Sequence, residues 1–157
     1  MTSYSDFGDL ADIYQELVVD HSRSPRNAGT LEHPTGASEG YNPLCGDRVK
    51  VFVDCREGQL KDVRFEGTGC AICTASASMM TEHVKGKAID DVVDAFHHFH
   101  QLVAGADGEG MADEEALDKL IAFAGVRRYP TRVKCATLPW HTLKSAVSGN
   151  DDSVTTE

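Results

Sequence analysis

Three of the five cysteines lie in three separate segments, and each segment has the composition of a turn or an element boundary. Cys45 follows Pro-Leu and precedes a glycine, Cys70 follows Gly-Thr-Gly, and Cys135 follows the basic stretch Arg132-Val133-Lys134. Thiols in such contexts can converge on one metal ion. A fold that does this must bring three distant segments to one point.

Asp47 stands two residues after Cys45, on the same side of an extended backbone. Together with Cys70 and Cys135, these residues form an anionic Cys/Asp/Cys/Cys set. Such a set suits a tetrahedral Zn²⁺ ion or an iron–sulfur unit better than a hard cation. We expect Cys70 and Cys135 each to stand at the start of a helix, where free N–H groups and positive potential favour the thiolate.

The other two cysteines and a histidine cluster are weaker candidates. Cys73 forms a C-x-x-C motif with Cys70, so a role as an auxiliary or alternative ligand stays open. Cys55 continues the apolar face of a predicted strand and is expected to fill the core. Of His97, His98 and His100, only the first and last share a helical face, which is typical of a solvated or partner-facing patch.

Length and charge restrict the class of protein. The 157 residues fit one domain, predicted over residues 1–147 with a disordered tail over 148–157. The 25 acidic residues outnumber the 15 basic ones, and the net charge of −10 disfavours nucleic acid and anionic membranes as partners. No long apolar run or secretory signal occurs, and an odd number of cysteines argues against a disulfide framework. We therefore expect a cytoplasmic protein with reduced thiols.

Hydrophobic periodicity predicts an α+β fold in which a small antiparallel three-stranded sheet packs against about five helices. A first helix should end before Pro25, and helical patterns follow Cys70, Ile89 and Asp113. A last helix is expected to begin just after Cys135, with Pro139 in its first turn. Strands are expected over residues 36–41, 48–55 and 63–65, the last two joined by a turn at 57–59, and a loop is expected through residues 105–110.

Over residues 14–147 the chain resembles the U-type family of iron–sulfur cluster assembly, in particular its SufU-type branch, which is related to IscU and to the N-terminal domain of NifU. Asp20-His21 and Pro25-Arg26-Asn27 carry part of the resemblance. The remaining matches are the block Gly-Tyr-Asn-Pro-Leu-Cys-Gly-Asp over residues 40–47, Gly-Cys-Ala-Ile over 69–72 and Ala-Ser-Ala-Ser-Met-Met over 75–80. The resemblance implies the same α+β fold.

The resemblance also implies a zinc-dependent sulfurtransferase that accepts persulfide sulfur from a pyridoxal-phosphate-dependent cysteine desulfurase of the SufS type. Sulfur would then pass to downstream SUF scaffold components. Cys45, Asp47, Cys70 and Cys135 would hold Zn²⁺. Cys45 would carry the persulfide, while Asp47 secures the site in its absence.

The alternative is an IscU-type scaffold that builds a [2Fe–2S] cluster on the same positions. The scaffold branch has a histidine immediately before its last cysteine, where this chain has Lys134. The long stretch between Met80 and Cys135 also resembles an insertion of the SUF branch. A third interpretation, a structural zinc module that binds a partner, stays open.

Overall fold

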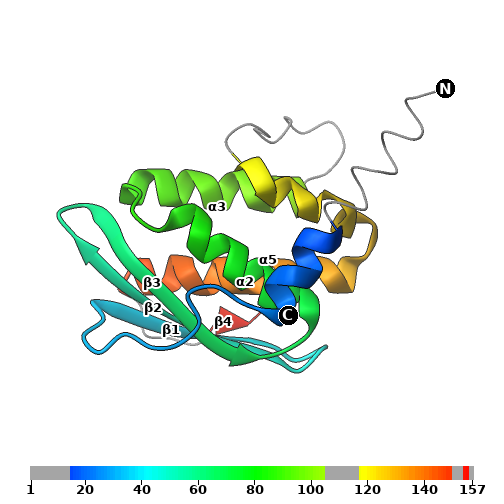
Figure 1. The fold of residues 1–157 in the computed structure, drawn as a ribbon, viewed down its shortest axis with the longest axis horizontal. Coiled ribbons are helices and arrows are strands. Elements are labelled where there is room, and N and C mark those ends of the chain that lie inside the picture. Colours follow the sequence, from blue (N-terminus) through cyan, green and yellow to red (C-terminus); the bar gives the residue numbers. More distant parts are fainter. Residues whose placement is uncertain (1–14, 105–116, 150–153, 156–157) are drawn as a thin grey trace.

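Three antiparallel strands and a short fourth strand form the sheet of the computed structural model, which describes residues 15–104, 117–149 and 154–155 (Figure 1). Strands β1 (Gly36–Asn42), β2 (Asp47–Arg56) and β3 (Gln59–Thr68) follow one another along the chain. The order across the sheet is β3-β2-β1-β4, in which the two-residue strand β4 (Val154–Thr155) pairs in parallel with β1. The predicted strands and hairpin are confirmed. Strand β4 lies in the tail that was expected to be disordered, most of which is outside the described residues.

The β2–β3 hairpin turns at Glu57 and Gly58, which both have positive φ, the geometry that matches the twist of paired strands. Val49, Val51 and Val53 alternate into the core as predicted. The pairing register shifts between Asp54 and Cys55. Because of this irregularity, Cys55 packs against the core but stays half-buried, so the prediction that it fills the core holds only in part.

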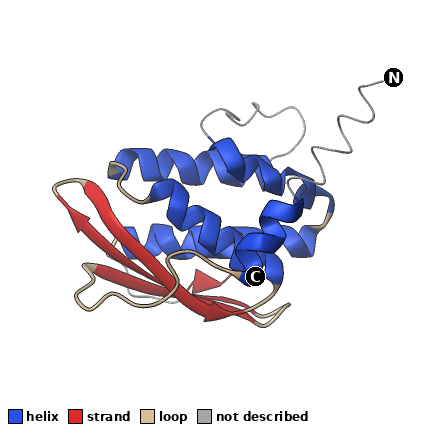
Figure 2. Ribbon diagram, viewed as in Figure 1, coloured by secondary structure: helices blue, strands red, loops and turns tan. Residues whose placement is uncertain are grey.

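Helices cover one face of the sheet (Figure 2). The first described helix spans residues 15–23, and the others are α2 (Ala71–Val84), α3 (Ile89–Ala104), the 3-10 helix η1 (Asp118–Arg128) and α5 (Pro130–Val147). Helix α5 packs on β1 and β2, and α2 packs on α5 and β3. Helices α3 and η1 pack against α5 and each other, farther from the sheet (Figure 1). The predicted α+β class with five helices is confirmed.

Two helix boundaries differ from the prediction. Helix α5 begins at Pro130, five residues before Cys135, and Pro139 lies inside the helix. The segment from Arg127 to Pro130 has the basic, turn-like composition that favours a later start, but a proline is also well suited to the first position of a helix, where its missing N–H costs no hydrogen bond. The helix predicted from Asp113 lies partly outside the described residues, and its described part continues past Gly125 to Arg128.

Two glycines of β1 allow α5 to cross the sheet closely. A Cβ atom at Gly40 would collide with the Thr142 side chain, and one at Gly36 would collide with the Ala146 carbonyl. At the other face of α5, Trp140 stacks on Phe99 of α3 with ring centroids 4.7 Å apart. The helix is therefore fixed between two layers, and this fixes the direction in which Cys135 projects.

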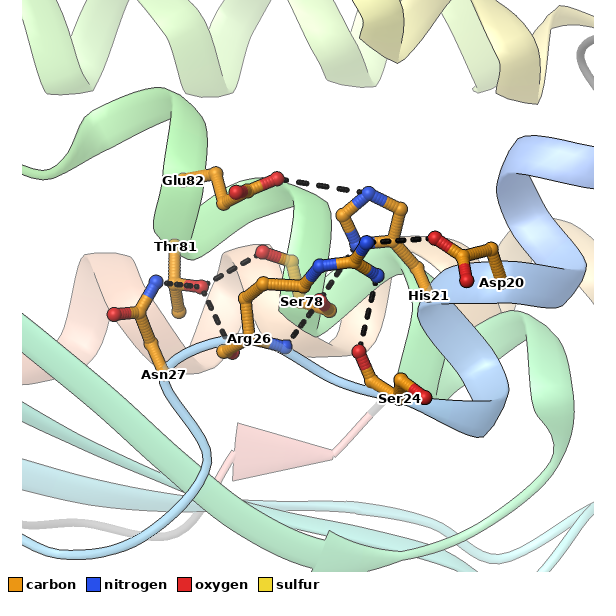
Figure 3. A network of polar contacts seen from close by, with 8 residues as sticks. All are labelled: Asp20, His21, Ser24, Arg26, Asn27, Ser78, Thr81 and Glu82. Carbon is orange, nitrogen blue, oxygen red and sulfur yellow. Dashed lines mark hydrogen bonds and ion pairs between the residues drawn. The ribbon is translucent and has the colours of Figure 1, made fainter.

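A polar network joins the end of the first helix to α2 (Figure 3). The buried His21 contacts the Ser78 hydroxyl through Nδ1 at 2.7 Å, and the Arg26 backbone N–H donates to the same oxygen at 2.8 Å. Asn27, with φ of 59°, donates its side-chain amide to Thr81 at 3.1 Å. The Asp20-His21 and Pro-Arg-Asn motifs therefore anchor the first helix to α2. In the described part of the chain, no helix has the length and apolar character needed to cross a membrane.

We expect the free energy of unfolding to fall as the pH drops from 7 to 5. Burial is the largest cause that lowers the pKa of His83 from 6.5 to about 4, and the positive charge of Lys87 lowers it further. Burial also lowers the pKa of His21 and of His141. Between these values the unfolded chain binds protons that the folded chain does not, so acid favours unfolding. Urea unfolding with a chelator present, at pH 7 and pH 5, measures this, and His83→Gln should flatten the dependence.

The matched control for this measurement is His33→Gln, a change at an exposed histidine. A pH dependence of His83→Gln as steep as that of the unchanged chain would contradict the assignment.

Candidate metal centre

Cys45 and Asp47 lie where β1 turns into β2. Asn42 and Asp47 pair across the turn, and the Gly46 N–H closes it by donating to the Asn42 carbonyl at 2.8 Å. Gly46 has φ of 74°, a conformation that glycine adopts without strain. The turn leaves Cys45 exposed and directs the Asp47 carboxylate inward, where the residue is 0% exposed.

Cys70 occupies the N-cap of α2, as the sequence predicts. Its backbone N–H donates to Asp47 Oδ1 at 2.8 Å, and its sulfur accepts the Cys73 N–H at 3.4 Å. The preceding Gly69 lies against the same carboxylate, since a Cβ atom there would stand 2.7 Å from Asp47 Oδ1. The start of β2 and the start of α2 are thus joined through the buried carboxylate of Asp47.

Cys135 reaches the site from within α5 and is 2% exposed. Its sulfur lies 3.5 Å from that of Cys45. The prediction that Cys135 stands at a helix start is wrong. Its thiolate therefore does not gain the expected stabilisation from free N–H groups at a helix N-terminus. Burial raises the pKa of this thiol, and hydrogen bonds with Asp47, Cys45 and Cys70 raise it further.

The ligand atoms of Cys45, Asp47 and Cys135 all lie within 4.8 Å of one another, and this cluster could hold a metal ion. Cys70 adjoins it, with its sulfur 3.9 Å from Asp47 Oδ2. In a tetrahedral site with Zn–S bonds of about 2.3 Å, neighbouring sulfurs stand about 3.8 Å apart. The 3.5 Å between the sulfurs of Cys45 and Cys135 is close to this value. Burial is the main reason that the pKa of Cys135 is raised, and a bound cation would offset the cost of a buried thiolate.

The structure separates the remaining candidates from this cluster. Cys73 points into the core, and burial raises the pKa of its thiol, which disfavours a ligand role. Cys55 lies at the opposite end of β2 from Asp47. His97 and His100 contact Phe96, and His100 also contacts His141 of α5. Across residues 15–104 and 117–149, only one group of three or more His, Cys, Asp or Glu side chains is close enough together to share a metal ion, and it consists of Cys45, Asp47 and Cys135.

One residue of the site was missed by the sequence analysis. Asn42 is 0% exposed, and its side-chain amide faces both Asp47 Oδ2, at 3.5 Å, and the Cys135 sulfur, at 3.6 Å. Its place in the Asn-Pro-Leu-Cys-Gly-Asp block was the available signal. A buried polar residue at the end of a strand often supports ligands that follow it.

Comparison with known proteins decides the family. Residues 13–136 match the family described as NifU-like N terminal domain. The chain belongs to this family. It is therefore an iron–sulfur cluster assembly protein of the SufU/IscU group, and the predicted family is confirmed.

Relatives within the family carry two different functional names. The chain is 36% identical over 139 residues to the zinc-dependent sulfurtransferase SufU of Bacillus subtilis, covering 88% of this chain and 92% of that one. It is also 36% identical over 138 residues to the iron-sulfur cluster assembly scaffold protein IscU of Streptococcus pyogenes, covering 88% and 84%.

A solved structure agrees with the fold. The putative iron-sulfur cluster assembly scaffold protein for the SUF system from Fervidobacterium islandicum has a TM-score of 0.78 and 35% identity to this chain. The match covers 84% of this chain and 94% of that one.

Replacement of Gly69 by alanine should weaken metal binding at least tenfold while leaving the fold intact. The added Cβ would displace the Asp47 carboxylate from its hydrogen bond with the Cys70 N–H, and supporting contacts of this kind change metal affinity about 10–100-fold. Competition of Zn²⁺ between the protein and a chromophoric chelator measures the affinity.

Gly125→Ala is the control, because a Cβ atom there meets nothing within 4 Å. Zinc bound by Gly69→Ala as tightly as by the unchanged chain would show that the carboxylate does not depend on this close approach.

Proposed function

We propose that this protein is a zinc-dependent sulfurtransferase that accepts persulfide sulfur from a cysteine desulfurase for iron–sulfur cluster assembly. One observation carries the proposal. The exposed Cys45 on a turn shares a ligand cluster with two buried residues, Asp47 and Cys135. A thiol in this position can leave the cluster toward a partner while the others stay in place.

The residues fit a zinc ion. Cys45, Asp47, Cys70 and Cys135 would hold it, since three thiols and one carboxylate form a donor set that tetrahedral Zn²⁺ accepts. A bound zinc ion would keep the thiols deprotonated at neutral pH. The name of the Bacillus subtilis relative supports zinc as the metal.

Transfer is a thiol exchange at Cys45. Its thiolate attacks the terminal sulfur of the desulfurase cysteine persulfide, so that a new S–S bond forms at Cys45 and the S–S bond on the desulfurase breaks. The desulfurase cysteine leaves as a thiolate, and no outside oxidant or reductant is needed. Asp47 and Cys135 are buried and Cys70 caps α2, which suits these three to keep the site formed while Cys45 reacts.

The second candidate function is that of a scaffold protein, on which a [2Fe–2S] cluster is built as cargo. It is favoured by the relatives named IscU, at 33–36% identity over most of the chain. Lys134, which stands immediately before Cys135 where the scaffold branch has histidine, weighs against it. A lysine ammonium carries no free electron pair for an iron ion at ordinary pH.

The test combines the protein with a cysteine desulfurase and cysteine. Alanine release should be faster with the protein than without it, because an acceptor clears the desulfurase persulfide. Mass spectrometry should find sulfur adducts of about 32 Da on Cys45. Cys45→Ser should abolish both effects while retaining zinc, since Asp47, Cys70 and Cys135 with water still offer four ligands.

Cys55→Ser is the matched control, a change at a half-buried cysteine away from the cluster, and should leave zinc content and transfer intact. Adducts found on Cys70 or Cys135 but not on Cys45 would overturn the assignment of the carrier. An unchanged rate of alanine release would count against transfer itself.

A further inference from the structure

Asn42 is buried behind the metal cluster and contacts three of its parts. It ends β1 and is 0% exposed. Its side-chain Nδ2 lies 3.5 Å from Asp47 Oδ2 and 3.6 Å from the Cys135 sulfur. Its Oδ1 accepts the Leu44 backbone N–H at 3.2 Å. One amide thus joins the carboxylate, the buried thiol and the turn that carries Cys45.

The hydrogen-bond partners fix which end of the amide faces the cluster. The Leu44 N–H is a donor and requires an acceptor, so the oxygen must face the turn. The NH₂ group is then directed at Asp47 and Cys135, which act as acceptors once ionised. A reversed amide would place its oxygen against a carboxylate and a thiolate.

The N–H donors are distributed unequally among the three thiols. Cys135 receives the Asn42 amide and Cys70 receives the Cys73 N–H, whereas Cys45 receives no N–H donor from the described residues. An N–H···S hydrogen bond stabilises the thiolate and withdraws charge from sulfur. The N–H donors therefore fix the positions of the Cys70 and Cys135 sulfurs and lower their nucleophilicity, whereas the exposed Cys45 keeps its nucleophilicity.

We infer that Asn42 is a positioning residue of the metal centre. It orients Asp47 Oδ2 and the Cys135 sulfur through its NH₂ group and holds the Cys45 turn through its oxygen. This inference rests on the proposed metal centre and adds a residue that makes Cys135 an anchor while leaving Cys45 free to react.

The test uses Co²⁺ as a probe, because its absorption reports both affinity and the number of thiolate ligands. Asn42→Leu removes donor and acceptor while nearly filling the same volume, and Asn42→Ala removes the whole amide. Both should weaken Co²⁺ binding at least tenfold, the range seen for supporting contacts of metal ligands. At saturating Co²⁺, the thiolate-to-cobalt charge-transfer band should lose intensity, because Cys135 is no longer oriented.

Ser38→Ala is the matched control. Ser38 is a buried polar residue of the same strand, 1% exposed, and its hydroxyl donates to Ser145 at 2.9 Å. Its replacement tests the effect of a lost buried hydrogen bond in β1, and should leave both the affinity and the band unchanged. Unfolding curves of all variants with chelator present report whether the metal-free fold survives.

The outcomes separate the inference from the proposed function. Affinity within twofold of the unchanged chain and an identical band in Asn42→Leu would overturn the inference, as would an equal loss in Ser38→Ala. A cobalt spectrum without thiolate bands in the unchanged chain would instead contradict the metal centre. Normal cobalt binding without desulfurase stimulation would contradict only the sulfur transfer.

Discussion

The hydrogen bond from the Cys70 N–H to the buried Asp47 carboxylate is the contact on which the site depends. It joins the start of β2 to the N-cap of α2, so that two of the three cysteine-bearing segments meet through protein groups alone. Gly69 permits this approach, since a side chain there would meet the carboxylate. A buried anion next to thiols is costly unless a cation or donors compensate it. The same contact therefore links the local fold to the cluster that could hold a metal ion.

The third segment arrives by packing. Helix α5 crosses β1 over Gly36 and Gly40, and on its opposite side Trp140 stacks on Phe99 of α3. This places the Cys135 sulfur next to the exposed turn, at 3.5 Å from the sulfur of Cys45. The buried and exposed parts of the centre thus have different origins. Asp47, Cys70 and Cys135 lie in or at the ends of packed elements, whereas Cys45 lies on a four-residue turn.

The ligand types, and the turn that carries Cys45 and Asp47, are local signals in the sequence, and the structure brings these two residues together with Cys135. The context of Cys135 is not local, because it lies within α5 and not at a helix start. Alternating valines likewise predict β2, and Cys70 follows a Gly-rich step into a helix as expected. The start of α5 was missed because Arg127–Pro130 has turn composition, and a proline favours both a turn and a first helical position. Asn42 was missed because its role depends on pairing across the turn with Asp47 and on the approach of Cys135 from α5, which are tertiary facts.

The central claim is that Cys45, Asp47, Cys70 and Cys135 form a zinc centre and not a platform for an iron–sulfur cluster. Elemental analysis with a visible spectrum, on protein purified under anaerobic conditions without added metal, tests it most directly. The account predicts a colourless protein with one zinc per chain, and loss of that zinc when Asp47 and Cys135 are both replaced by alanine. A brown protein that contains iron and sulfide in place of zinc would contradict it.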